Sequence, residues 1–130
     1  MDYDKIQLYI YILQDALKLQ AWDIFVAQES ADDECHASIH FTSGRRVAYI
    51  CLHPEWGSRS DSDKRQDLVH ELLHVFHHDT DDNLFQSLHA SGDLSRYVVS
   101  ILIGQTSRDL ERMVDSLTNV IAPFLPPWED

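Results

Sequence analysis

Residues 67–76 read DLVHELLHVF and combine a helical spacing of apolar side chains with an H-E-x-x-H motif. With His70 at zero on a helical wheel, the apolar side chains fall in an arc of roughly 140° to 300°. A step of four residues turns a helix by only about 40° and rises about 6 Å, so His70 and His74 share the opposite side. The stretch predicts a helix that packs by one side and offers two imidazoles by the other.

Glu71, at about 100° on this wheel, lies beside the two histidines, which can share one metal ion. A carboxylate placed there can hold a metal-bound water and accept its proton. The alternative is that these three are polar surface side chains. With eight histidines in the chain, a chance match to the motif has a probability of roughly 2%. The motif and its matched apolar frame favour a metal site.

A catalytic zinc ion takes three protein ligands and keeps one position open. The later stretch ERMVD (residues 111–115) places two carboxylates four residues apart on a predicted helix. Glu111 is therefore the expected third ligand. Asp115 is expected to accept a hydrogen bond from the outer nitrogen of a ligating histidine.

Four other side chains compete with Glu111 for this role: His77, His78, Asp79 and His89. His77 lies at about −20° but some 10 Å along the helix axis from His70, and His78 is turned off by about 80°. Their geometry is less favourable, and they remain alternatives.

The chain outside the motif predicts one α+β domain over residues 1–130. A helix is expected from about residue 3 to 20, a strand over 22–28, and a hairpin of strands 36–42 and 46–52. If its turn centres on Gly44, then Ala37, Ile39 and Phe41 oppose Cys51, Tyr49 and Val47. The sheet is expected to be three-stranded and mainly antiparallel.

The C-terminal half is predicted to be helical. The central helix begins near residue 61 and runs through His78, the cluster 79–83 breaks it, and a weaker helix follows near 83–90. A further helix from about residue 93 is expected to divide near 104–107 and to end at Pro123. The aromatic tail around Trp128 is expected to cover the core.

The composition narrows the function further. Twenty-two acidic against ten basic residues give a net charge of −12, which disfavours nucleic acid and anionic lipid as partners. No apolar run approaches the roughly 18 residues of a membrane span, and the acidic N-terminus is unlike a signal peptide, so a cytoplasmic location is expected. Cys35 and Cys51 are expected to be free thiols.

The pairing of HELLH with a downstream ERMVD resembles the gluzincin branch of the zincin metallopeptidases. The wider layout is similar to small zincin-like proteins of phages and prophages, which would place the chain in a host cytoplasm. The resemblance implies a minimal zincin-like fold with an N-terminal helix, a small sheet, an active-site helix and C-terminal helices. It also implies Zn²⁺ held by His70, His74 and Glu111, with Glu71 as general base and Asp115 supporting a ligand.

The activity that this resemblance implies is hydrolysis of amide bonds in a peptide or protein substrate by a Glu71-activated, zinc-bound water. Full-size peptidases of this branch stabilise the oxyanion with a His or Tyr; no motif identifies that residue here, and Tyr97 and His89 are the candidates. The strand 46–52 would be the sheet edge that pairs with an extended substrate. The alternative function is a catalytically silent, zinc-stabilised phage protein that binds other proteins.

Overall fold

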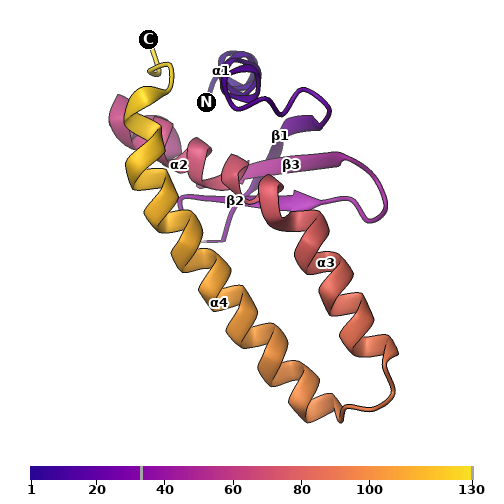
Figure 1. Cartoon of the computed structure of the whole chain (residues 1–130). Helices are drawn as coiled ribbons and strands as arrows, with labels where there is room; N and C mark the ends of the chain where they lie inside the picture. Colours follow the sequence, from indigo (N-terminus) through magenta and orange to yellow (C-terminus); the bar gives the residue numbers. More distant parts are fainter. Residues whose placement is uncertain (33, 130) are drawn as a thin grey trace.

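The computed structural model describes residues 1–32 and 34–129 and has the predicted α+β class (Figure 1). Helices and strands follow one another as α1 (Tyr3–Ala16), β1 (Asp23–Ser30), β2 (Ala37–Phe41), β3 (Val47–Leu52), α2 (Asp61–Leu73), α3 (Val75–Ala90) and α4 (Arg96–Ile121). Short 3₁₀ turns at Trp56–Ser58 and Ala122–Phe124 lie before α2 and after α4.

The sheet has the strand order β1-β3-β2, which makes β3 the central strand. β2 pairs with β3 in the antiparallel sense, as expected for a hairpin, but β1 runs parallel to β3, so the sheet is mixed rather than mainly antiparallel. The expectation that 46–52 forms a sheet edge was wrong, because β1 occupies its outer side. The edge strand beside α2 is β2.

The register of the hairpin differs from the expected one by a single residue. Ile39 pairs with Ile50 and Phe41 with Ala48, because the ladder closes with Thr42 donating to the Val47 carbonyl, which leaves a four-residue loop. Gly44 lies in this loop with φ of 72°. A shift of one residue exchanges the two faces of a strand, so Tyr49 points away from the core.

α1, one face of the sheet and α2 share the main hydrophobic core. Its fully buried members include Ile6, Ile10 and Leu13 of α1, Ile24, Ala48 and Ile50 of the sheet, Leu68, Val69 and Leu72 of α2, and Val114 of α4. The apolar side predicted for the central helix is buried from Leu68 to Val75, whereas Phe76, which lies beyond the end of α2, is 58% exposed. The tail covers this core as expected, with Trp128 edge-on to Tyr9 and Trp56.

The helix ends differ from the expected ones. α1 stops at Ala16 and Lys18 adopts a positive φ of 62°. α2 begins as expected, with the Ser60 hydroxyl accepting from the Asp63 amide, but it ends at Leu73, and α3 starts directly after His74. The expected break at 79–83 is absent, since Asp81 and Asp82 bond to side chains four residues away within α3.

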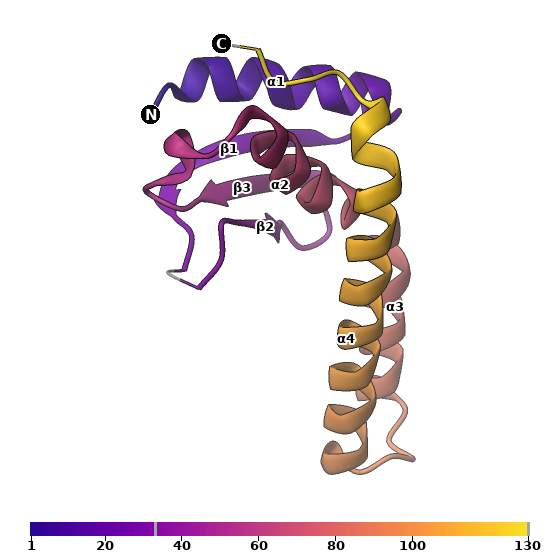
Figure 2. The ribbon, with the colours of Figure 1, turned by 90° about the vertical axis from the view of Figure 1, so that its left-hand side faces the viewer.

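α4 is also continuous, and the expected division at 104–107 does not occur. Gly104 alone costs a helix only about 1 kcal/mol, and no proline accompanies it. α3 and the first half of α4 form a helical hairpin that extends away from the sheet (Figure 2). The second half of α4 packs against α2, which brings the ERMVD stretch to the HELLH helix.

Candidate metal centre

α2 supplies two imidazoles on neighbouring turns. Its apolar side is locked into the core, so His70 and His74 point away from that core, with side chains 19% and 15% exposed. Their Nε2 atoms lie 3.3 Å apart. Two ligands about 2.05 Å from a tetrahedral zinc ion would be separated by about 3.3 Å, so the spacing fits a shared ion.

α4 brings a carboxylate to the same point. Glu111 Oε1 lies 2.8 Å from His70 Nε2, and Glu111 Oε2 lies 3.1 Å from His74 Nε2. Within the described residues, His70, His74 and Glu111 form a group whose ligand atoms all lie within 4.8 Å of one another. This group could hold a metal ion. The sequence named the same three side chains.

The hydrogen-bond partners at Nδ1 of His70 and His74 influence whether the Nε2 atoms are free to bind a metal ion. Asp115 Oδ1 lies 3.2 Å from His70 Nδ1, where a carboxylate can only accept. His70 thus has a carboxylate at each ring nitrogen, and a metal ion bound at Nε2 would leave the proton on Nδ1, where it is donated to Asp115. Asp115 thus has the geometry expected of it from the sequence.

His74 has a longer outer connection that the sequence analysis missed. His77 Nε2 lies 2.9 Å from His74 Nδ1, and Asp81 Oδ1 lies 3.0 Å from His77 Nδ1. His77 was considered only as a competing ligand. Its spacing of three residues from His74, with Asp81 four residues further along, was the signal for this chain of contacts.

Glu71 lies beside the group but outside it. Its side chain is buried, with 8% exposure. Burial is the main cause that raises its pKa from 4.5 to about 8, and the carboxylates of Glu111 and Asp67 add to it. Burial also lowers the pKa of His74, while Glu111 opposes that change. A carboxyl group poised near neutrality can both take and return a proton.

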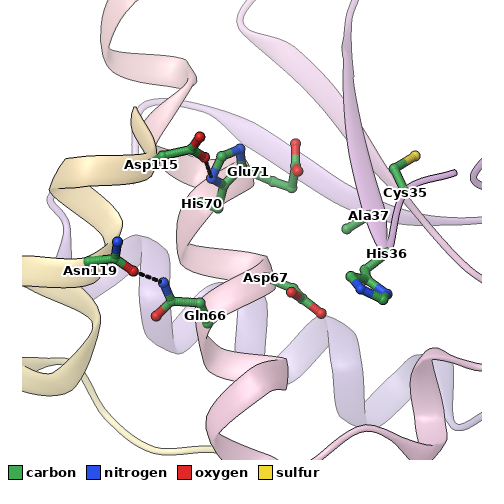
Figure 3. A pocket seen from close by; sticks show the side chains of 9 residues that line it. All are labelled: Cys35, His36, Ala37, Gln66, Asp67, His70, Glu71, Asp115 and Asn119. Atoms are coloured by element: carbon green, nitrogen blue, oxygen red, sulfur yellow. Dashed lines mark hydrogen bonds and ion pairs between the residues drawn. The ribbon is translucent and has the colours of Figure 1, made fainter. Parts of the chain in front are cut away.

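An open cavity of about 510 Å³ adjoins His70 and Glu71. Figure 3 shows that its walls come from α2, α4 and the segment that leads into β2, with the amides of Gln66 and Asn119 joined across it at 2.7 Å. Asp67 lies on the cavity wall and is held by the Arg59 guanidinium, with the shortest contact 2.7 Å. The cavity gives an extended molecule access to Glu71.

The other candidates lie elsewhere. His78 stacks on Phe41 with ring centroids 3.8 Å apart, Asp79 is exposed, and neither belongs to the metal group. His89 and Tyr97 lie on the projecting hairpin, more than 20 Å of helix from the ligands at about 1.5 Å per residue. At that separation neither side chain reaches an oxyanion at the metal group.

Some remaining expectations concern the whole chain. Cys35 and Cys51 are free, as expected. In the described part of the chain, no helix has the length and apolar character needed to cross a membrane. Comparisons of this chain with protein-family models, with curated proteins and with solved structures found no match.

Proposed function

We propose that this protein is a zinc-dependent metallopeptidase of the zincin type that hydrolyses peptide bonds. The observation that carries the proposal is the convergence of three metal-binding atoms, from His70, His74 and Glu111, next to the buried carboxyl group of Glu71 at an open cavity. Two imidazoles and one carboxylate suit zinc, and three protein ligands leave a fourth position open.

Zinc bound here would polarise the scissile carbonyl and acidify a water molecule. The protein's own contribution is to position the groups. Glu71 would accept the proton of the attacking water and return it to the leaving amine. Asp115 holds the outer nitrogen of His70, which keeps the Nε2 lone pair directed at the ion.

A peptide is the substrate class that the surroundings favour. β2 is the edge strand nearest α2, and its free side can take up an extended chain by main-chain hydrogen bonds. Ala37, at its start, and the preceding His36 also line the cavity. A peptide paired with β2 would therefore run past Glu71.

The test uses the zinc-loaded protein of residues 1–130 in a peptide-library digest with and without chelator, together with elemental analysis for zinc. Glu71→Gln keeps the shape and removes the base, so we expect one equivalent of zinc to remain and hydrolysis to fall by at least about a hundredfold. Glu29→Gln, at an exposed position on β1, is the control and should change neither.

A loss of zinc with Glu71→Gln would make Glu71 a ligand and contradict the assignment. Glu111→Ala should weaken zinc binding by at least about a hundredfold, and an unchanged zinc content would remove Glu111 from the site. A wild-type protein that holds zinc tightly but cleaves no peptide would instead favour the silent, zinc-stabilised binding module.

A further inference from the structure

The two histidine ligands are supported differently at their outer nitrogens. His70 meets the carboxylate of Asp115 directly, whereas His74 meets a second imidazole, His77, which in turn meets Asp81. The direct partner is exposed, with 59% of the Asp115 side chain accessible. The longer series, through His77 and Asp81, is sheltered from water, because these two side chains are only 16% and 18% exposed.

The Asp81 end of the hydrogen-bonded series His74–His77–Asp81 favours one order of donors and acceptors. The Asp81 carboxylate can only accept, so the proton of a neutral His77 resides on Nδ1 and its Nε2 carries a lone pair. That lone pair accepts from Nδ1 of His74. A neutral His74 that donates from Nδ1 carries no proton on Nε2, the atom that faces Glu111 and His70, and this is the tautomer that can bind a metal ion there.

We propose that His77 and Asp81 are positioning residues that hold His74 in the tautomer and ring orientation required to bind the metal. This inference rests on the proposed metal site and adds to it the residues that support one of its ligands. His77 is not itself a ligand, since its Nε2 faces the outer side of His74 and it does not belong to the metal-binding group. Contacts of this kind are sheltered from water here and keep their strength.

The hydrogen-bonded series His74–His77–Asp81 also connects the end of α2 with the start of α3. His74 is the C-cap of α2, while His77 and Asp81 lie in the first two turns of α3. Because the two residues are four apart on α3, that helix must be formed for the series to exist. The start of α3 is thereby tied to the metal ligand.

The first experiment measures the zinc affinity of the protein of residues 1–130 by competition with a chelating indicator. His77→Phe keeps a ring but removes both hydrogen bonds, and we expect zinc to bind 10- to 100-fold more weakly, the usual cost of losing such a partner. In His77→Gln the amide can accept from His74 and donate to Asp81, so affinity should return to within a few-fold of wild type. His89→Phe, at an exposed position on the same helix, is the control.

Equal affinity in wild type and His77→Phe would overturn the proposal, as would failure of Gln to do better than Phe. Thermal unfolding with excess chelator shows whether each variant folds. Asp81→Asn is a second variant: its amide nitrogen and oxygen are nearly the size of the carboxylate, and a several-fold loss of affinity is expected.

A second measurement needs no metal. In the metal-free protein near pH 8, long-range ¹H–¹⁵N spectra of the imidazoles should show His77 protonated on Nδ1 and not on Nε2, and a proton on Nε2 of His77 would refute the hydrogen-bonded series. A wild-type protein without zinc affinity would refute the proposed function, whereas these spectra would still decide whether the hydrogen-bonded series exists.

Discussion

The body of the molecule, formed by α1, the sheet, α2 and the C-terminal tail, differs sharply from its arm, residues 79–108 of α3 and α4. In the body, Ile10, Leu13 and Leu72 are completely buried. The structure describes every residue of the arm. Among these residues only Val99 is buried, and Tyr97 is 76% exposed. Tyr97, Ile101 and Leu102 recur at helical spacing in the arm, as Ile6, Ile10 and Leu13 do in the body, so such spacing alone does not show how much core a helix will share.

The candidate metal centre lies where these two regions meet. The body fixes His70 and His74, because the opposite side of α2 is part of its core. Glu111, His77 and Asp81 come from the helices that continue into the arm. The site therefore depends on both regions. The packed core holds α2 and its two histidines, and the positions of α3 and α4 determine where Glu111, His77 and Asp81 lie.

The largest expected effect on stability is in the body. Trp128 is 6% exposed and packs on Tyr9 and Trp56, with ring centroids 5.2 and 5.7 Å away. Trp128→Ala should lower the free energy of unfolding by about 3–5 kcal/mol, measured by urea denaturation. Phe124→Ala, at an 87% exposed position of the same tail, is the control. Equal losses for the two would show that the tail does not complete the core.

A smaller effect should appear at the junction and depend on pH. The pKa of Glu71 is raised by burial from 4.5 to about 8, so its protonated form favours the folded state. Its stabilising contribution is complete below pH 4.5 and is lost as pH rises through about 8. In metal-free protein, Glu71→Gln should therefore gain stability relative to wild type as pH rises between these values.

That gain cannot exceed about 1.4 kcal/mol per pH unit. Urea denaturation at pH 5 and pH 8 with chelator present measures it, and Glu29→Gln serves again as the exposed control. A difference between Glu71→Gln and wild type that stays the same at both pH values would mean that Glu71 is hydrated like a surface carboxyl group. The junction would then resemble the arm rather than the body.

The smallest effect is expected in the arm. Tyr97→Ala removes a large side chain that is already 76% exposed, so the free energy of unfolding should change by no more than about 0.5 kcal/mol. The measurement is urea denaturation at several protein concentrations. A loss comparable to that of Trp128→Ala would contradict the contrast between the two regions, because it would show that the arm is covered in solution.

Several features could be predicted because they depend on neighbouring residues. The apolar side of the helix at 67–76 fixed the burial of Leu68 and Leu72 and the direction of His70 and His74. Helix ends were predicted less well. The acidic cluster at 79–83 resembled a breaker, but Asp81 and Asp82 find partners one turn away and the helix continues.

The parallel pairing of β1 with β3 could not be predicted from the sequence. The hairpin at 36–52 is local. β1, in contrast, pairs with β3 although β2 lies between them in the sequence, and no short-range signal specifies that contact. The same applies to the hairpin register. The loop could close over three or four residues, and the choice that buries Ile50 opposite Ile39 was made by the core.

The amino-acid sequence by itself determined the amphipathic helix, the spacing of its two imidazoles and the carboxylates that could join them, because helical geometry repeats every few residues. Only the tertiary structure decided that Glu111 reaches those imidazoles, that Glu71 is buried and that His77 connects His74 to Asp81. Contacts between separate helices and the exclusion of water depend on how whole elements pack, and no short stretch of sequence contains that information.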